Sequence, residues 1–324
     1  MFSLLLGPLL ASCKDRKDAP LRIAVIPKGT THEFWKSVHA GVMRAAASRS
    51  AGKIEVIWKG PLKEDDLKSQ IDIVQSMIAQ GVAGIVLAPL NDKALVNPVK
   101  AAMDAKIPVV IFDSGLQGKD YLGFVGTDNA AAGGKAAAHL GKVMGGKGKV
   151  LVLRYQEGSA STAAREEGFL SGLRAASRDL TVVSDKQYGG ATTESAFTAA
   201  ENLLAATKAA EGGVDAVFCP NESTTFGMLL ALQKAKLAGK IKLVGFDASE
   251  KLIQGLRDGH IEGLVLQDPM MMGDLALRTV VDGIHGQKPS AVQDTGSRVV
   301  GKADLDSAEV QALLRPDLKK WLGE

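Results

Sequence analysis

Apolar and polar residues alternate along this chain in a repeating pattern of short strands and longer helices. The predicted strands are short runs rich in Val, Ile and Leu, and the predicted helices are longer stretches with apolar residues at helical spacing. In the first series the strands are Ile23–Ile26, Ile54–Trp58, Gly84–Ala88, Val109–Phe112 and Leu122–Val125, and the helices are roughly 33–50, 64–80, 92–105 and 130–144. Strands separated by helices of this length predict βαβ units and parallel sheets.

The same pattern starts again at Lys149. The second series has strands at Lys149–Leu153, Leu180–Gln187, Ala216–Cys219, Lys242–Phe246 and Gly263–Leu266, and helices near 162–176, 192–210, 223–237 and 249–258. Two similar series predict an α/β protein with two doubly wound, Rossmann-like lobes, each a parallel sheet covered by helices.

The end of the chain predicts that the two lobes are joined by more than one crossing. A helix near 270–285 and a strand at Arg298–Val300 follow the second series, and a charged helical tail, Asp304–Leu322, is expected to cap a lobe. We expect crossings near Thr127-Asp128, Gln267-Asp268 and Ser297, which together form a multi-strand hinge. The expected division is 1–20 as a lipoprotein signal peptide and tether, 21–127 plus 268–296 as the N-terminal lobe, and 128–267 plus 297–324 as the C-terminal lobe.

Length and charge narrow the functional classes. A chain of 324 residues is long for one hydrophobic core, which favours two domains. The net charge is only +3, and no Lys/Arg cluster with interleaved aromatics occurs, which argues against a nucleic-acid surface. After the N-terminal leader the apolar runs have strand length, and none reaches the roughly 18 residues of a membrane span.

The N-terminus predicts export. Residues 1–12 form a short apolar stretch that stops at Cys13 and is followed by a polar, charged run. Leu10-Ala11-Ser12-Cys13 resembles the bacterial lipobox, which implies a mature protein that begins at a lipidated Cys13. The alternative is an apolar start with a coincidental cysteine, because positive residues before the apolar stretch are missing. Cys219, the other cysteine, is expected to be buried, so neither a disulfide nor a metal framework is predicted.

The segment Arg22–Trp35 indicates small-molecule capture. Its strand breaks at Pro27, a polar loop with Lys28 and His32 follows, and Phe34 and Trp35 open a helix. Aromatics at this place lie at the carboxyl end of a sheet, where open α/β folds bind ligands. Adjacent helical residues point about 100° apart, so we expect only one of the two rings to face a cleft.

Polar side chains also follow the later strands. The residues concerned are Asp113, Asn221, Asp247 and Gln267. In two facing lobes such strand ends meet in a cleft, where carboxylates and amides are hydrogen-bond partners for hydroxyl groups. The alternative for each aspartate is a helix cap or turn.

Signatures of enzymes are weak. Asp113, Asp247 and His32 could act as acid and base, but the chain has no nucleophile elbow, phosphate loop or metal-spaced pair of histidines. No G-x-G-x-x-G lies between a strand and a helix, so neither a dinucleotide nor another cofactor is predicted.

These motifs together resemble the ribose-binding-protein family, the type I periplasmic sugar-binding components of ABC importers. The resemblance covers Arg22 to about Gln287 and is carried by IAVIPKGTTHEFW, GIVLAPLNDKAL, IPVVIFDSG, FVGTDNAAAGGKAA, STAAREEGF, QYGGATTESAFTAAENLL, AVFCPNESTTFG and LVGFDASEKLIQGLRDG. It implies two lobes that close on one ligand.

The resemblance also implies residue roles. Asp113 is similar to the family's sugar-hydroxyl acceptor, and one of the paired aromatics Phe34 and Trp35 is expected to stack on the sugar. The further ligand-binding residues that it implies are Asn221, Asp247, Gln267, Arg165 and Tyr188. Lys28 and His32 are expected in the site but, like Ala88 and Ser114, depart from the pattern of pentose-binding members. Their donors would suit an anionic or oxygen-rich ligand.

The sequence therefore predicts an exported, lipid-anchored, monomeric receptor for a sugar or sugar-like molecule, with an ABC permease as its partner. One other function remains open. The same lobes could serve a ligand-sensing subunit for a chemoreceptor or sensor kinase. A transcription repressor is disfavoured, because an apolar leader stands where a DNA-binding helix-turn-helix would be needed.

Overall fold

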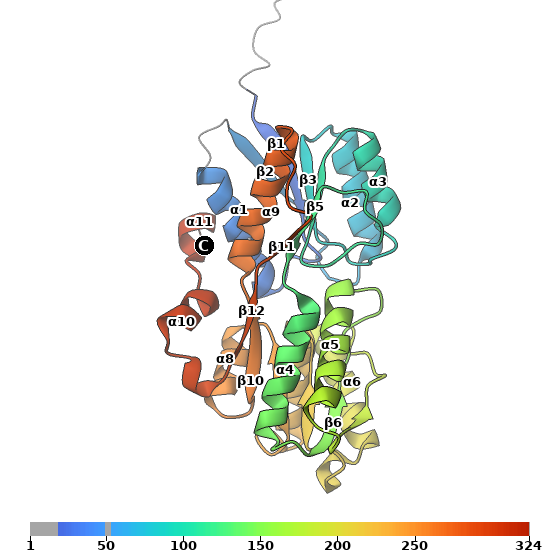
Figure 1. The fold of residues 1–324 in the computed structure, drawn as a ribbon, viewed down its shortest axis with the longest axis vertical. Helices are drawn as coiled ribbons and strands as arrows, with labels where there is room; N and C mark the ends of the chain where they lie inside the picture. The colour runs from blue at the N-terminus through green and yellow to red at the C-terminus, as the bar shows by residue number, and fades with distance from the viewer. Residues whose placement is uncertain (1–18, 49–52, 324) are drawn as a thin grey trace, which may run out of the picture.

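The computed structural model describes residues 19–48 and 53–323 and shows two lobes stacked along the long axis (Figure 1). The N-terminal lobe contains a sheet in the order β11-β5-β4-β3-β1-β2, in which every neighbouring pair is parallel. Its strands are β1 (Leu21–Ile26), β2 (Ile54–Trp58), β3 (Gly84–Leu87), β4 (Val109–Phe112), β5 (Gly123–Gly126) and β11 (Val292–Asp294).

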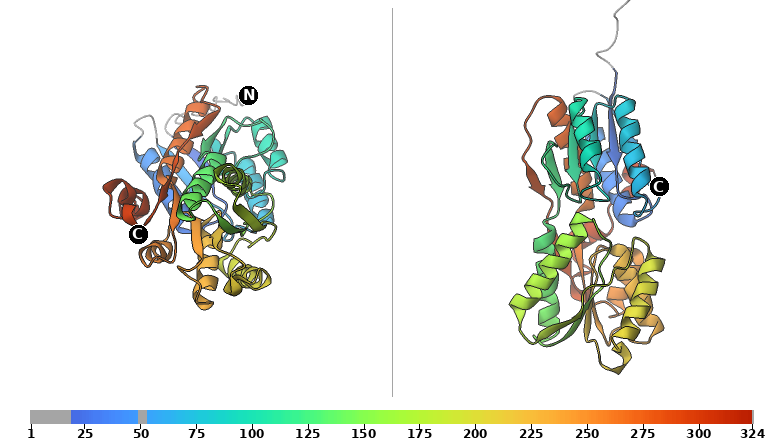
Figure 2. Two further views of the ribbon diagram at one scale, coloured as in Figure 1. Left: turned by 60° about the horizontal axis from the view of Figure 1, so that its bottom comes forward. Right: turned by 90° about the vertical axis from the view of Figure 1, so that its right-hand side faces the viewer.

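Helices cover both faces of this sheet, which explains its continuous apolar strands. Ile23 and Val25 pack toward one face and Ala24 and Ile26 toward the other, and all four are fully buried. The helices of the lobe are α1 (Glu33–Ser48) and α9 (Pro269–Ile284) on the first face, and α2 (Leu67–Ala79) and α3 (Val96–Asp104) on the second (Figure 2).

The C-terminal lobe repeats this architecture. Its sheet has the order β12-β10-β9-β8-β6-β7, and all neighbours are parallel except β12, which runs antiparallel to β10. The strands are β6 (Gly148–Val152), β7 (Leu180–Ser184), β8 (Ala216–Phe218), β9 (Lys242–Phe246), β10 (Gly263–Gln267) and β12 (Ser297–Val300). The helices are α4 (Asn129–Val143) and α5 (Ala160–Ala176) on one face, and α6 (Thr193–Ala206), α7 (Glu222–Lys234) and α8 (Glu250–Arg257) on the other. The predicted fold class is confirmed.

Three connections between the sheets lie side by side and are tied to one another. They run from β5 into α4, from β10 into α9, and from β11 into β12. The Thr127 hydroxyl donates to Gln267 Oε1 at 2.9 Å, and the Asp128 backbone N–H donates to Asp294 Oδ1 at 3.0 Å. These bonds join all three crossings. The sequence did not predict β11, whose Val292 is an exposed residue at the edge of the sheet.

The C-terminal tail contacts both lobes. It contains a 3₁₀ turn (Lys302–Asp304), α10 (Ala308–Leu314) and α11 (Leu318–Leu322). Val310 of α10 is buried in the core of the C-terminal lobe, whereas α11 packs against α1 of the N-terminal lobe (Figure 1). The assignment of all of 297–324 to the C-terminal lobe does not anticipate this second contact.

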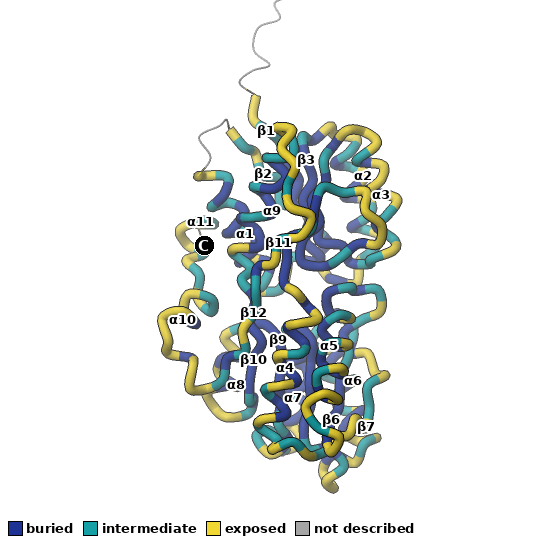
Figure 3. Tube along the Cα trace, in the orientation of Figure 1, coloured by how far each residue is buried: buried dark blue, intermediate teal, exposed yellow. Residues whose placement is uncertain are grey.

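Burial in Figure 3 is concentrated in the inner strands of the two sheets, and β3, β4, β8 and β10 are buried over their whole length. Within the described residues, no helix is long and apolar enough to cross a membrane.

Candidate functional site

Two aspartates occupy equivalent places at the strand ends of the two lobes. Asp113 follows β4 and Asp247 follows β9, and both have left-handed backbones, with φ of 59° and 66°. Their backbone N–H groups donate to Val125 and Val265, each at 2.9 Å, which continues the ladder one residue past the strand. Aspartate tolerates this conformation better than most residues. Both side chains are buried and line one cavity between the lobes.

Lys28 connects the two lobes in this cavity. Its Nζ lies 3.2 Å from Asp113 Oδ2 and donates to Ser161 Oγ at 3.0 Å. Ser161 lies in the first turn of α5 in the C-terminal lobe, and its backbone N–H donates to Ser114 Oγ at 3.1 Å. The ammonium group is therefore paired and buried. Sequence analysis expected Lys28 to offer a donor that suits an anionic ligand, but its positive charge is already balanced by Asp113.

Arg165 of α5 is held rigidly in the C-terminal lobe. Its Nε donates to Asn129 Oδ1 at 2.7 Å and its Nη1 donates to the Pro220 carbonyl at 3.0 Å. The guanidinium carbon lies 4.1 Å from the centre of the Phe246 ring, and Nη1 lies 4.0 Å from Asp247 Oδ2. Nη2 is buried without a hydrogen-bond partner among the described residues. It lies in a cavity-lining side chain and is free to donate to a ligand.

The place of Arg165 depends on direct backbone contact between α4 and α5. A methyl group at Gly133 would lie 2.0 Å from the carbonyl oxygen of Arg165, whereas one at Gly134 would have its nearest neighbour at 4.0 Å. We expect Gly133→Ala to destabilise the protein by about 1–3 kcal/mol, because the two helices must separate. Gly134→Ala is the matched control and should stabilise it by up to about 1 kcal/mol through helix propensity. Urea unfolding measures both, and equal stabilities would contradict this packing.

Asp247 is coupled to the hinge. Its Oδ1 accepts a hydrogen bond from Gln267 Nε2 at 2.7 Å, and Gln267 Oε1 accepts the Thr127 hydroxyl. Burial raises the pKa of Asp247, while the nearby Arg165 charge and the Gln267 bond act in the opposite direction. Asp247 is therefore linked through Gln267 to the chain crossing at Thr127.

Glu64 organises the first-lobe side of the site. Its Oε1 accepts from Trp35 Nε1 at 2.7 Å and lies 3.0 Å from His32 Nδ1, and its Oε2 accepts the Tyr155 hydroxyl at 2.6 Å. Burial disfavours both charges, but the mutual attraction of His32 and Glu64 and their hydrogen bond outweigh it. The pKa of His32 rises to about 9 and that of Glu64 falls to about 2. Because Tyr155 follows β6, Glu64 also ties the lobes together.

The two adjacent aromatics, Phe34 and Trp35, differ in how far they are buried. Trp35 is only 3% exposed and belongs to the core of the N-terminal lobe, where its ring meets Phe112 edge-on with centroids 6.1 Å apart. Phe34 is half-buried, and its centroid lies 4.9 Å from that of Trp35. Phe34 therefore offers the more accessible ring at the cavity.

The first turn of α7 brings two more polar residues to the cavity. Asn221 caps the helix, since its Oδ1 accepts from the Thr224 backbone N–H at 3.3 Å and from the Thr224 hydroxyl at 2.6 Å. Glu222 follows it, and its Oε2 is buried with no hydrogen-bond partner in the described part of the chain. Burial raises the pKa of Glu222 to about 7.

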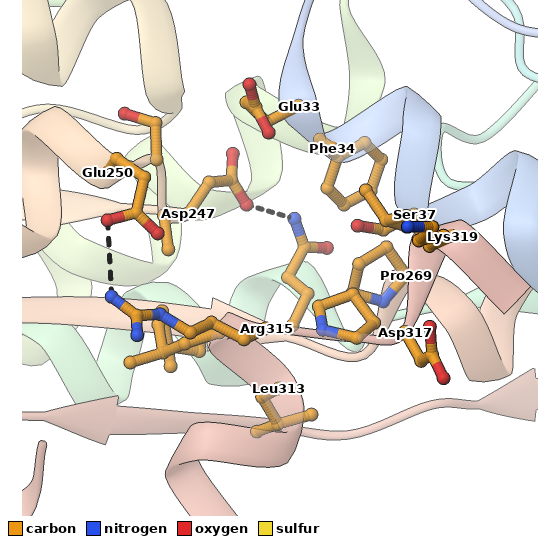
Figure 4. Close-up of a pocket in the computed structure, with 17 residues that line it drawn as sticks. Glu33, Phe34, Ser37, Asp247, Glu250, Pro269, Leu313, Arg315, Asp317 and Lys319 are labelled. Atoms are coloured by element: carbon orange, nitrogen blue, oxygen red, sulfur yellow. Dashed lines mark hydrogen bonds and ion pairs between the residues drawn. The ribbon is translucent and has the colours of Figure 1, made fainter. Parts of the chain in front are cut away.

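A second, larger cavity adjoins the first beneath the C-terminal tail. It has a volume of about 370 Å³, against about 30 Å³ for the cavity between the strand ends, and the two share Phe34, Asp247 and Gln267. In Figure 4 the tail forms one wall, with Arg315 reaching to Glu250 at 3.3 Å. The charged groups converge in the smaller cavity, which meets the larger one at the three shared residues, so the candidate binding site comprises both.

Comparison with known proteins identifies the family. A model described as a periplasmic binding protein domain matches residues 23–288. The chain belongs to this family. Similar curated proteins are the D-ribose/D-allose-binding protein of Pseudomonas aeruginosa, 29% identical over 89% of each chain, and the ribose import binding protein of Bacillus subtilis, 28% identical over 79% of each. They place this periplasmic binding protein with the type I sugar-binding proteins of the ribose-binding-protein family, as the sequence predicts.

Solved structures of relatives agree in fold. A solute-binding protein from Agrobacterium vitis with bound D-fucose is 33% identical, with a TM-score of 0.85 over 91% of this chain and 100% of that one. One from Agrobacterium radiobacter in complex with D-arabinose is 31% identical, with a TM-score of 0.86 over 92% and 99%. These relatives are sugar-binding transport proteins and not enzymes, and the family implies export to the periplasm.

The structure brings most of the predicted site residues of the periplasmic binding protein together. The cavity is lined by nine of them: Lys28, His32, Phe34, Trp35, Asp113, Arg165, Asn221, Asp247 and Gln267. Tyr188 is not among them. It is 42% exposed and forms a bridge with Arg154, just after the edge strand β7. The predicted lipidation site Cys13 lies outside the described residues.

Sequence reasoning missed five lining residues: Glu64, Tyr155, Ser161, Thr162 and Glu222. Tyr155 and Glu222 each lie within a few residues after a strand of the C-terminal lobe, so the strand-end rule could have found them. Glu64 lies in the loop between β2 and α2, where no local pattern distinguishes it from its exposed neighbours.

Proposed function

We propose that this periplasmic binding protein captures one sugar or sugar-like molecule in the cavity between its lobes and presents it to the permease of an ABC importer. The observation that carries the proposal is the pair of buried aspartates, Asp113 and Asp247, facing one cavity from equivalent strand ends. Beside them lies Arg165 Nη2, which has no hydrogen-bond partner in the described part of the chain. Two acceptors and a fixed donor suit a ring with several hydroxyl groups.

Phe34 supports a ligand with a flat apolar face. Its ring lines both cavities and is more exposed than that of Trp35. A sugar ring stacked on Phe34 would bury its C–H face, while its hydroxyl edge meets the charged groups. We propose Phe34 as the stacking residue and Trp35 as its support.

Closure of the lobes is the proposed mechanism of capture. Several bonds already cross between the lobes, including Lys28 to Ser161, Tyr155 to Glu64, and Gln156 Nε2 to the Glu64 carbonyl at 3.0 Å. A ligand shifts the population toward this closed form only by the contacts it makes there and not in the open form. The hinge at Thr127 and Gln267 lets the lobes separate as units.

Isothermal titration over a panel of pentoses, hexoses and polyols tests the proposal. We expect at least one to bind with a dissociation constant in the micromolar range or below, about −8 kcal/mol or stronger. Small-angle scattering of the same sample should show a more compact molecule when the ligand is added. A folded protein that gives no heat with any member of the panel would contradict the sugar assignment.

We also propose that the exported protein is monomeric and anchored through Cys13. The leader before this cysteine and its lipobox-like sequence support the anchor.

The proposed N-terminal lobe is 21–127 plus 268–296, and the proposed C-terminal lobe is 128–267 plus 297–324. Helix α11 of the second lobe packs against α1 of the first.

A further inference from the structure

We infer that Glu222 is a ligand contact and that it selects a sugar or polyol carrying a protonated amino group. This rests on the proposed function and narrows its ligand class. Glu222 lines the same cavity as Asp113 and Asp247, and its Oε2 is buried with no partner among the described residues. A buried carboxylate oxygen without a partner carries a desolvation penalty that a ligand donor removes.

The other charged groups in the cavity are paired with one another. Lys28 lies 3.2 Å from Asp113, Arg165 lies 4.0 Å from Asp247, and His32 lies 3.0 Å from Glu64. Each cation therefore has its own carboxylate. Glu222 is the fourth carboxylate, and the described residues offer it no ion-pair partner.

Negative groups therefore outnumber positive groups among the lining side chains. There are three cations, Lys28, His32 and Arg165, against four carboxylates, so the cavity carries one negative charge when all are ionised. An anionic ligand would add to this excess, whereas a neutral sugar would leave it unchanged. A single ammonium group would neutralise it.

The surroundings of Glu222 are themselves negative. Burial is the main cause that raises its pKa to about 7, and the charges of Asp247, Glu64 and Glu33 raise it further. Only His32 acts in the opposite direction, and His32 is already paired with Glu64. A ligand cation beside Glu222 would be stabilised by all of these carboxylates in a place of low dielectric.

Matched pairs of sugars test this inference by isothermal titration at pH 7. The probes are D-glucose with D-glucosamine, D-galactose with D-galactosamine, and D-mannose with D-mannosamine, with the uncharged N-acetyl forms as controls for bulk. We expect at least one amino sugar to bind tenfold or more tightly than its parent, and N-acetylation to remove the gain. Glu222→Gln should erase this preference, so that the amino sugar and its parent bind with equal affinity. The tenfold gain that it removes corresponds to about 1.4 kcal/mol.

Glu194→Gln is the matched control variant. Glu194 also lies in the first turn of a helix, α6, but is exposed and does not line the cavity, so the same loss of charge should leave the preference intact. Between pH 7 and 5.5 the affinity for the amino sugar should fall by up to tenfold per unit, because protons compete for Glu222. In Glu222→Gln this dependence should disappear.

The outcomes separate the two proposals. Neutral sugars that bind as well as their amino partners would overturn the inference and leave the sugar-binding function standing. A preference that survives in Glu222→Gln would also overturn it. A folded protein that binds neither neutral nor amino sugars would overturn the proposed function, and the inference with it.

Discussion

Replacing Asp247 with asparagine is expected to weaken ligand binding by roughly 10- to 100-fold, or about 1.4–2.7 kcal/mol, while the fold stays intact. Asparagine keeps an oxygen that accepts from Gln267 Nε2, and it tolerates the left-handed backbone at φ 66°. What it loses is the charge, and charge-assisted hydrogen bonds are the stronger ones. The affected quantity is therefore the affinity for a hydroxyl-bearing ligand.

Asp247→Ala separates binding from stability. It should show at least the same loss of affinity and an additional loss of about 1–2 kcal/mol in the free energy of unfolding, because alanine disfavours a left-handed backbone. Asp113 occupies the same conformation at φ 59°, so Asp113→Asn and Asp113→Ala should repeat the pattern in the other lobe. Isothermal titration with a sugar that the natural protein binds measures the affinity, and urea unfolding measures the free energy of unfolding. Unchanged affinity in Asp247→Asn would remove Asp247 from the site.

The fold and the strand-end residues could be predicted because they depend on local sequence. Each lobe repeats the same signals, a buried strand, a polar residue at its carboxyl end and an amphipathic helix. Asp113 and Asp247 follow directly from this pattern, since both come after an apolar strand ending in Phe. Gln267 follows from the same strand-end pattern, whereas Arg165 was placed in the site by family resemblance, and both line the cavity.

The rest depends on contacts between lobes or on burial that the local pattern does not encode. Glu64 and Tyr155 meet across the cleft, although they are 91 positions apart in the chain. Likewise, α11 packs on α1 only because the tail returns to the first lobe. The sequence left open which of Phe34 and Trp35 faces the cleft, and Trp35, although it lines the cavity, belongs to the buried core of the N-terminal lobe. A loss of binding in Trp35→Ala would therefore be mixed with a loss of stability.

The buried pair of His32 and Glu64 is expected to make stability depend on pH. The folded pKa of His32 is raised from 6.5 to about 9, so its contribution is complete below pH 6.5 and is lost as the pH rises through 9. The folded pKa of Glu64 is lowered from 4.5 to about 2, so its contribution is present above pH 4.5 and is lost as the pH falls through 2. Stabilisation by the pair is therefore greatest between about pH 4.5 and 6.5.

His32→Gln tests this expectation by urea unfolding at pH 6 and pH 9.5. At pH 6 the variant should be less stable than the natural protein by up to about 3 kcal/mol, the value of a pKa shift of this size, and at pH 9.5 most of the difference should vanish. Tyr155→Phe is the matched control, because it removes the hydrogen bond to Glu64 Oε2 and leaves His32 in place beside Oε1. That variant should lose stability but keep the pH dependence. An equal difference between His32→Gln and the natural protein at both pH values would mean that the pKa of His32 is the same in the folded and unfolded states, and would contradict the ion pair with Glu64.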